Sequence, residues 1–472
     1  MAVVTKRSKA LAVNPLKTSA PMGAALAFLG VNRAMPMLHG SQGCTAFAKV
    51  FFVRHFREPI PLQTSAMDQV STIMSADENV IEGLATLCAK SKPALVGIPT
   101  TGLSETQGTD VRRVVKAFRA QHPEFAHIPV VPVNTPDYCG SLETGYAAAV
   151  QAMIDVLVPP DRPTPGRDEK RINVLAGPSL TPGDLEHVKE LVEAFGLHPV
   201  VFPDLADSLD GHLTEEDFSA LTIGGTEVAH LRTLGEAVAT IVIGRSLDAA
   251  ANLLCVRTGV PDHRFDHLMG LQAVDAFIHV LARISGQPVP RRIARQRAQL
   301  QDALVDTHFA LGFARLAIAA EPDLLLALVD TVRASGAEVV AAVAPVAAPH
   351  LSQLPVVEVK IGDLEDLELA ARAGDAAIVI SNSHATGTSA RLGVPLLRAG
   401  FPQYDLVGGY QKLWVGYRGT RQTLFDLANL LLLQAHHEIT PYRSFLSVKD
   451  GGAAVTDAAF EAASAEVAAD VH

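Results

Sequence analysis

Short apolar runs alternate with segments of helical spacing along most of the chain. Strands are expected at residues 94–98, 128–133, 172–176, 198–202, 239–244, 314–318, 339–343, 356–359, 376–380 and 394–397. Amphipathic helices are expected between them, at residues 109–119, 144–158, 182–195, 265–284, 291–311, 322–334, 364–373 and 423–435. Strands that alternate with helices are typical of βαβ units. The pattern therefore predicts an α/β fold with parallel sheets flanked by helices.

The chain divides at Pro159–Arg171, a segment rich in proline and charge that is typical of an interdomain linker. A length of 472 residues exceeds what one core usually supports and favours roughly three domains. We expect α/β domains at residues 1–165, 170–288 and 289–400, and a C-terminal helical segment at 401–472 that packs back on the earlier domains. The part after about Asp450, rich in Ala and Glu, is expected to be a frayed helix or disordered.

Composition and charge narrow the class of protein. The net charge of −11 disfavours nucleic acid or an anionic membrane as the main partner. No apolar run approaches the roughly 20 residues that a membrane-spanning helix needs. The basic start (Lys6, Arg7, Lys9) is not followed by the apolar stretch of a signal peptide. A cytoplasmic location is therefore expected.

The four cysteines do not form a metal cage by themselves. No two of them have the spacing of a zinc or ferredoxin site, and structural disulfides are not expected in a reducing compartment. Cys88 and Cys255 fall at apolar positions and are expected in the core. Cys139 follows a strand in a loop, and core packing is favoured for it as well.

Cys44 lies in the sequence His39-Gly-Ser-Gln-Gly-Cys-Thr-Ala-Phe47, which we expect to be a short loop that leads into an aromatic segment. Flanking glycine would let its thiolate meet a metal without a bulky neighbour. The alternative is a small buried hydrophobic residue, because free cysteine is often buried. For Cys44 considered alone, the core interpretation is favoured.

Other candidate sites have simpler explanations. The chain contains no Walker A sequence and no G-x-G-x-x-G. Three strand-to-helix junctions, at residues 100–109, 177–183 and 381–389, could bind anions at helix N-termini, but helix capping requires the same Ser and Thr residues and is favoured. His263 and His267, with Asp262 and Asp266 beside them, are expected to lie one helical turn apart and could ligate a metal in an H-x3-H arrangement. Solvated histidines near a helix start are the favoured interpretation.

The segment around Cys44, followed by Arg54–Pro59, resembles the cluster-binding segment of the nitrogenase β-subunit superfamily. Further matches are Pro99–Thr101, Val131–Pro136, Gly140–Ser141, Ser381–Ser383 and Arg398–Pro402. They extend from about residue 14 to residue 435, which is nearly the whole chain. The resemblance implies a nitrogenase β-subunit-like fold of three Rossmann-like domains.

The sequence departs from that superfamily at two positions. The three cysteines that a nitrogenase β-subunit uses for its large iron–sulfur cluster align with Ser19, Cys44 and Gly102, so only one thiol is retained. A serine hydroxyl is a poor ligand for soft metals and glycine has no side chain, so the chain cannot hold half of an eight-iron cluster. Asp137 aligns with a redox-dependent serine ligand and is treated only as a neighbour. This pattern is similar to the β-like subunits of the scaffolds on which the iron–molybdenum cofactor matures.

The resemblance implies that Cys44 is one ligand of a [4Fe-4S] cluster. Such a cluster normally takes four protein ligands, so the other three would come from a NifE-like α subunit in an α2β2 heterotetramer. The resemblance also implies that Gly40 and Gly43 bring backbone N–H groups near the cluster sulfurs. Their alternative role is to permit the turn.

The resemblance further implies an assembly scaffold rather than an enzyme with a diffusible substrate. The scaffold would hold a transient iron–molybdenum cofactor precursor while molybdenum and homocitrate are added. Its interface cluster would relay electrons from the Fe protein reductase, with the helix around Ile81–Gly83 in the docking face. Precursor-donating assembly proteins and the apo-nitrogenase would be the other partners.

Three alternatives to this interpretation differ in what they require. A catalytic nitrogenase β-subunit would need thiols at Ser19 and Gly102. The β-like subunit of dark-operative protochlorophyllide reductase would supply a cluster ligand other than cysteine. The presence of Cys44 in the motif disfavours this alternative. A periplasmic-type binding module without a cluster would need a signal peptide, and none is expected here.

Overall fold

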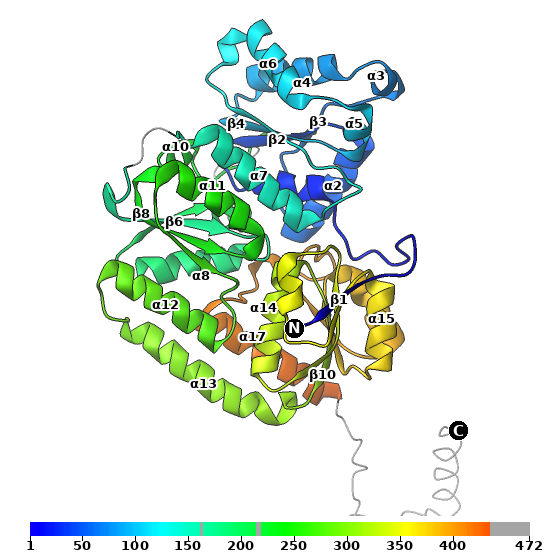
Figure 1. Ribbon diagram of the computed structural model, residues 1–472, viewed down its shortest axis with the longest axis vertical. Helices are drawn as coiled ribbons and strands as arrows, with labels where there is room; N and C mark the ends of the chain where they lie inside the picture. The colour runs from blue at the N-terminus through cyan, green and yellow to red at the C-terminus, as the bar shows by residue number, and fades with distance from the viewer. Residues whose placement is uncertain (161–163, 214–218, 435–472) are drawn as a thin grey trace, which may run out of the picture. The chain divides into compact units, whose positions relative to one another are not determined.

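Three parallel β-sheets form the framework of the chain in the computed structural model (Figure 1). The structure describes residues 1–160, 164–213 and 219–434. Within these ranges, all neighbouring strands of the three sheets are parallel. The predicted α/β class, with parallel sheets flanked by helices, is therefore confirmed. All three sheets belong to one unit, residues 1–431.

The first sheet has the strand order β3-β2-β4-β5 and a core on each face. Its strands are β2 (Ala34–Leu38), β3 (Gln63–Thr64), β4 (Leu95–Pro99) and β5 (Val130–Val133). The surrounding helices are α1 (Ala20–Leu29), α2 (Gln42–Phe56), α3 (Gln69–Ile73), α4 (Asp77–Lys90), α5 (Gly102–Gln107), α6 (Val111–Gln121) and α7 (Leu142–Leu157). Side chains alternate between faces along a strand. Val96 accordingly joins the core beneath α4 and α6, whereas Leu95 joins the main core with Phe28 of α1 and Tyr146 of α7.

The second sheet has the strand order β7-β6-β8-β9. Its strands are β6 (Asp168–Ala176), β7 (His198–Phe202), β8 (Ala237–Ile243) and β9 (Asp262–Phe265). Its helices include α8 (Pro182–Glu193), α9 (Leu205–Ser208), α10 (Val228–Arg232), α11 (Asp248–Thr258) and α12 (Leu271–Ser285). Arg257 of α11 donates to the main-chain oxygens of Asp155 (2.7 Å) and Val158 (2.8 Å). These bonds fix the end of α7 against the second sheet.

The third sheet has the strand order β1-β12-β11-β10-β13-β14. Its strands are β1 (Val3–Lys6), β10 (Arg315–Ala319), β11 (Glu338–Ala344), β12 (Glu358–Ile361), β13 (Ile378–Ser381) and β14 (Leu396–Arg398). Its helices include α13 (Arg291–Leu311), α14 (Pro322–Ala334), α15 (Leu364–Ala373) and α16 (Thr386–Leu392). Strand β1 pairs with β12 through Val4 and Val359. The extreme N-terminus, which we assigned with residues 1–165, is therefore part of the third sheet.

Residues 401–431 contact both earlier sheets. Asp184 of α8 accepts hydrogen bonds from the backbone N–H groups of Trp414 (2.6 Å) and Val415 (3.0 Å). Burial of this carboxyl group raises its pKa to about 6. Gln403 N–H donates to Nδ1 of the buried His55 in α2 (2.9 Å). Helix α17 (Gly416–Gln434) follows, and the predicted irregular tail after Asp450 lies outside the described residues.

Most predicted elements after residue 94 are present, and α13 begins and ends as predicted, at Arg291 and Leu311. The helix predicted over residues 265–284 is partly wrong. Phe265 ends β9, and α12 begins only at Leu271, after Gly270. The linker is shorter than predicted because β6 begins at Asp168.

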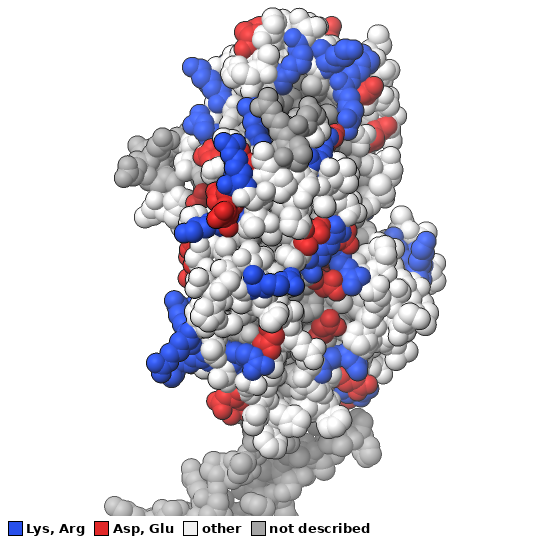
Figure 2. Space-filling view, turned by 60° about the vertical axis from the view of Figure 1, so that its left-hand side comes forward, with Lys and Arg blue, Asp and Glu red and all other residues white. Residues whose placement is uncertain are grey.

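Figure 2 shows one face of the molecule, on which basic and acidic side chains are interspersed among wide uncharged areas. Many charges of the described residues are paired, as in Arg297–Asp275 (2.8 Å) and Arg264–Asp262 (2.7 Å). None of the described helices combines the length and apolar character that crossing a membrane would need.

Candidate functional site

The predicted site residues lie at one edge of the first sheet. The chain leaves β2 at His39, β4 at Thr100 and β5 at Asn134. Because these strands are parallel, their carboxyl ends share an edge, which is where open α/β sheets bind ligands. Thr101 Oγ1 donates to the main-chain oxygen of His39 (2.9 Å), and Thr135 Oγ1 donates to that of Thr100 (2.8 Å). The three loops are thus held together in a fixed order.

Cys44 lies in the first turn of α2, so the prediction that it belongs to a loop is wrong. The helix begins after Ser41, whose extended backbone places it at the N-cap position. Cys44 is exposed, and Ser41 Oγ donates to its sulfur at 3.4 Å. The interpretation of Cys44 as a core residue is therefore wrong for this chain, whereas its role as a metal ligand stays a prediction.

The two glycines of the motif have different surroundings. A Cβ atom on Gly40 would lie 2.5 Å from Thr101 Oγ1, so glycine is needed there for close packing. For a Cβ atom on Gly43, the one neighbouring atom within 4.0 Å would be Ser41 Oγ. Nothing in the described chain fills the space beside Gly43. Glycine at Gly43 therefore leaves helix backbone open to an outside group.

The N-terminus of α2 has no side-chain cap. The Ser41 side chain accepts no hydrogen bond from the backbone N–H groups of the first turn. The first N–H groups of a helix have no partner within the helix, and together with the helix dipole they favour an anion at this end. Sequence reasoning missed this feature because Ser41 is an ordinary capping residue type. Only its geometry shows that it leaves the turn uncapped.

Ser19 and Gly102 reach the same edge as Cys44. Ser19 precedes α1, and Thr18 O accepts a hydrogen bond from Leu142 N–H (2.9 Å) at the end of the loop after β5. Gly102 opens α5, and its N–H donates to Asp137 Oδ2 at 2.9 Å. Asp137 thus binds the backbone at the position where the resembled family has a cysteine. Neither Ser19 nor Gly102 supplies a thiolate.

His39 holds the start of the motif through a buried side chain. Its Nδ1 lies 2.9 Å from Ser65 Oγ, which also accepts from Gly40 N–H (3.2 Å). Burial disfavours the charged imidazolium and lowers the pKa of His39 to about 4. His39 is therefore a neutral structural residue near pH 7. Its Nε2 has no hydrogen-bond partner among the described residues.

The His39→Gln variant is expected to lose less stability in acid than the wild-type chain. As the pH falls below the ordinary value of 6.5, the unfolded chain binds the His39 proton first, so the free energy of unfolding decreases until the folded value near 4 is reached. At pH 5 this amounts to at most about 2 kcal/mol. Urea unfolding at about pH 7 and about pH 5 measures the difference.

The exposed His279→Gln variant is the control, and its stability should follow that of the wild-type chain at both pH values. Equal acid destabilisation of the His39 variant and the wild type would contradict the buried-imidazole explanation.

An exposed apolar surface extends from Cys44 along α2. Phe47, Val50 and Val53 are 72%, 51% and 40% exposed. The opposite face of the helix carries Phe52 and Phe56, which are in the core. Contiguous exposed apolar side chains are typical of surfaces that bind a protein, a membrane or a ligand. We call Phe47, Val50 and Val53 the α2 apolar face.

The other candidate residues do not form a second metal site. Cys88 is buried as predicted, and burial raises its pKa to about 11. Cys139 is exposed, so its predicted core packing is wrong. His263 lies in β9 rather than on a helix, and so it is not one helical turn from His267. No group of three or more His, Cys, Asp or Glu residues within the described ranges could hold a metal.

The strand-to-helix junctions are capped from within the chain. Thr101 and Ser104 form a capping box, as do Thr181 and Asp184. Asn382 accepts a hydrogen bond from His384 N–H. The capping interpretation of these segments is thus confirmed, which leaves α2 as the uncapped helix start in the predicted motif.

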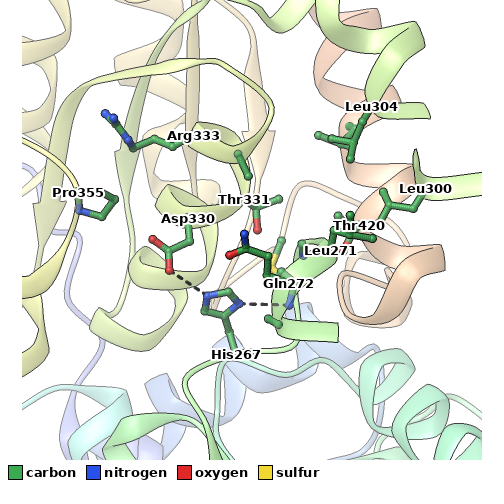
Figure 3. Close-up of a pocket in the computed structure, with 15 residues that line it drawn as sticks. His267, Leu271, Gln272, Leu300, Leu304, Asp330, Thr331, Arg333, Pro355 and Thr420 are labelled. Carbon is green, nitrogen blue, oxygen red and sulfur yellow. Dashed lines mark hydrogen bonds and ion pairs between the residues drawn. The ribbon is translucent and has the colours of Figure 1, made fainter. Parts of the chain in front are cut away.

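A separate cavity of about 640 Å³ lies between α12, α13, α14 and α17 (Figure 3). His267 Nδ1 accepts from Met269 N–H (3.3 Å), and Nε2 lies 3.2 Å from Asp330 Oδ2. Leu300, Leu304 and other apolar side chains form the facing wall. This cavity contains no cysteine and belongs to a different part of the fold from Cys44.

Comparison with known proteins agrees with the fold and the motif. Residues 19–432 match the family described as nitrogenase component 1 type oxidoreductase. The chain is 46% identical to the nitrogenase iron-molybdenum cofactor biosynthesis protein NifN of Klebsiella pneumoniae, over 97% of this chain and 100% of that protein. It is also 46% identical to NifN of Nostoc sp., over 92% and 96% of the two chains.

A solved structure of nitrogenase Cp1 at pH 6.5 matches with a TM-score of 0.85 and 28% identity, and covers 94% of this chain and 98% of that one. A second Cp1 chain, 14% identical with a TM-score of 0.70, shares the fold. The chain therefore belongs to the nitrogenase component 1 type oxidoreductase family, and the two relatives described above are NifN proteins.

Proposed function

We propose that this chain is a scaffold subunit for biosynthesis of the nitrogenase iron–molybdenum cofactor. With a NifE-like α subunit it holds a cofactor precursor while molybdenum and homocitrate are added, and it shares a [4Fe-4S] cluster through Cys44. The observation that carries the proposal is the single exposed thiol on an uncapped helix N-terminus. The names of the NifN relatives support the biosynthetic role.

The residues at this edge fit a cluster that is completed by another chain. Cys44 offers one thiolate, whereas Ser19 and Gly102 offer none. A [4Fe-4S] cluster normally takes four protein ligands, so three come from the partner. The absence of a complete metal-binding group within the described ranges agrees with a divided ligand set. The same ligand count disfavours a catalytic nitrogenase β-subunit.

Each element of the motif has a separate task in this proposal. Cys44 binds one iron, and the first N–H groups of α2 face the negative charge of the cluster. Gly43 leaves that backbone accessible, and Gly40 lets the loop pack under Thr101. When bound, the cluster supplies one-electron transfer. Hydrogen bonds from the protein to cluster sulfurs tune its reduction potential.

The α2 apolar face is assigned to the NifE-like partner. It begins one helical turn after Cys44, so a chain that supplies the remaining cluster ligands also covers Phe47 and Val50. Apolar and aromatic side chains at the centre of an interface contribute most of its binding energy. The family resemblance implies a heterotetramer of two α and two β subunits. The α2 apolar face, on helix α2 of this chain, accounts for one contact between an α and a β subunit.

The Phe47→Asp variant is expected to weaken the complex with the NifE-like partner by roughly tenfold or more. A carboxylate at this position would be buried without a counter-charge when the subunits associate. Co-expression with the partner, followed by size-exclusion chromatography at decreasing concentration, measures the dissociation. Val256→Asp is the control, because Val256 is 84% exposed on α11 and lies outside the proposed interface. Equal dissociation of both variants would contradict the assignment.

The docking face for the Fe protein reductase is assigned to α3 and α4. Gly83 lies on the inner face of α4, because a Cβ atom there would lie 3.2 Å from Met37 Sδ. The Ile81 side chain is half-buried. The exposed groups nearby are Val70 and Ile73 on α3 and Met74 directly after it. Gln107 of α5 donates to the main-chain oxygens of Ser71 (2.5 Å) and Thr72 (3.0 Å), which ties α3 to the helix that starts at Gly102.

The chain acts as a carrier in this proposal and turns over no diffusible substrate. It receives the precursor from assembly proteins and delivers the finished cofactor to the apo-nitrogenase. Purification with the NifE-like partner, followed by an iron count and an absorption spectrum, tests the proposal. A brown complex with iron for one [4Fe-4S] cluster per α–β pair, in addition to any bound precursor, is expected. A colourless complex without iron would overturn the cluster assignment.

A further inference from the structure

The N-cap of α7, the start of α14 and the short turn before α11 meet at three carboxyl groups, of which two are buried and that of Glu321 is half-buried; we call these three segments the helix starts. Helix α7 follows Ser141, α14 follows Glu321, and the short turn at Arg245–Leu247 leads into α11. The carboxyl groups are those of Glu143, Glu321 and Asp323. Glu143 and Asp323 are 2% and 1% exposed. The helices α7, α11 and α14 are labelled in Figure 1.

Each carboxyl group accepts a hydrogen bond from an element other than its own. Glu143 Oε2 accepts from Asp323 N–H (2.9 Å), and Asp323 Oδ2 accepts from Ser246 N–H (3.1 Å). Glu321 accepts from Ser141 Oγ, at the start of α7. Carboxylates are the preferred caps of helix N-termini. Glu143 caps the first turn of α14, whereas the other two bonds hold the N-cap residue of α7 and the turn before α11. Together the three bonds connect elements of the first, second and third sheets.

Burial and mutual repulsion oppose full ionisation of this group. Burial, reinforced by the charges of Asp323 and Glu321, raises the pKa of Glu143 well above its ordinary value. Burial also raises the pKa of Asp323 and raises that of Glu321 to about 7. Carboxyl groups that interact electrostatically do not ionise independently, so the protonation of each one depends on the others.

Few positive groups face the three carboxyl groups. Lys17, from the segment before α1, acts on Glu321. His350 Nε2 lies 3.5 Å from Asp323 Oδ1. Arg245 also acts electrostatically with Asp323, but its guanidinium is paired with Asp266 (2.7 Å). Lys17, His350 and Arg245 therefore do not supply enough positive charge to balance Glu143, Glu321 and Asp323 when all three carboxyl groups are ionised.

We propose that Glu143, Glu321 and Asp323 form a proton-dependent latch between the three sheets. In the partly protonated state they bind the start of α14, the N-cap residue of α7 and the turn before α11 and hold these segments together, and full ionisation loosens them. A cavity of about 500 Å³ lined by Glu143, Ser246 and His350 lies beside the latch and gives water access to the ionised groups. Because Ser141 ends the loop that carries Asp137, the latch also controls the mobility of that loop. This proposal does not depend on the [4Fe-4S] assignment.

Hydrogen exchange of the purified full-length chain, measured at about pH 6 and about pH 8.5, tests the latch. A carboxyl group with a pKa of about 7 changes from about one tenth ionised to nearly fully ionised over this range. After correction for the intrinsic pH dependence of exchange, peptides that contain Glu143, Ser246 and Asp323 are expected to exchange roughly tenfold faster at the higher pH. The peptide at the start of α15 is the internal control. Burial acts to raise the pKa of its capping residue Asp363, but hydrogen bonds from Lys9 and from backbone N–H groups hold that pKa below the ordinary value.

The Glu321→Gln variant should lose most of this pH response at all three helix starts, and Glu143→Gln is the second variant if the first does not fold. Glu338→Gln, at an exposed position of β11, should retain the response. An unchanged response in the Glu321 variant would overturn the proposal. So would equal exchange of the wild-type helix starts at both pH values.

Discussion

Replacement of Cys44 by alanine is expected to remove the interface cluster from the co-expressed complex while the fold stays intact. One thiolate from this chain completes the ligand set in the proposed assembly, so its loss leaves an iron without a protein ligand. The folded chain loses little, because Cys44 is exposed and its sulfur accepts only the weak hydrogen bond from Ser41 at 3.4 Å. Its free energy of unfolding should change by about 0.5 kcal/mol or less.

Iron content and the electron paramagnetic resonance spectrum of the reduced complex measure this loss. The iron of one [4Fe-4S] cluster per α–β pair and its signal should disappear. Cys139→Ala is the matched control, since Cys139 is also exposed and lies in the loop after β5 at the same sheet edge. The control should retain iron and signal. Unchanged iron and an unchanged signal in the Cys44 variant would exclude Cys44 as a ligand.

The elements of the fold could be predicted where apolar runs alternate clearly with segments of helical spacing. The regular alternation after residue 94 gave most of the later strands and helices. Helix α1 was missed because all ten of its residues are buried, so it has no polar face to mark a helical period. Strand β2 was missed because Pro36 interrupts it, and proline is rare in a central strand.

Strand β1 was missed for another reason. Its four residues, Val3–Lys6, carry no periodic signal, and their partner β12 lies more than 350 positions later in the chain, at Glu358–Ile361. Pairing over such a separation is decided by the assembled third sheet rather than by local sequence. The assignment of residues 1–165 to one domain could therefore not anticipate this strand.

A sequence motif identified the candidate site, but it did not predict the geometry of that site. Family resemblance pointed to Cys44, Gly40 and Gly43, although residue type alone favoured a core cysteine. The sequence did not reveal that Ser41 leaves α2 uncapped or that Asp137 binds Gly102 N–H, because both depend on side-chain geometry. The carboxyl latch was missed since its members come from segments about 180 residues apart.

The Gly145→Ala variant is expected to prevent stable folding of the chain. A Cβ atom on Gly145 of α7 would lie 1.8 Å from the main-chain oxygen of Ala20 in α1. The reverse contact is equally close, because a Cβ atom on Gly23 would lie 1.8 Å from Leu142 O. Backbone atoms cannot turn aside as side chains do, so the two helices must separate. Overpacking of this kind costs about 3 kcal/mol or more, a large part of the usual stability of a domain.

Soluble yield and the urea midpoint of the full-length chain measure the effect. Gly43→Ala is the matched control, because Gly43 is also a helical glycine but its added Cβ would meet only Ser41 Oγ at 4.0 Å. Alanine has the higher helix propensity, so this control should be as stable as the wild type or slightly more stable. Separation of α1 from α7 would also move Ser19 and Ser141, which begin these helices at the edge that carries Cys44. A Gly145 variant with the wild-type urea midpoint would show that α1 and α7 do not pack this closely. It would also contradict the placement of Ser19 at the sheet edge that carries Cys44.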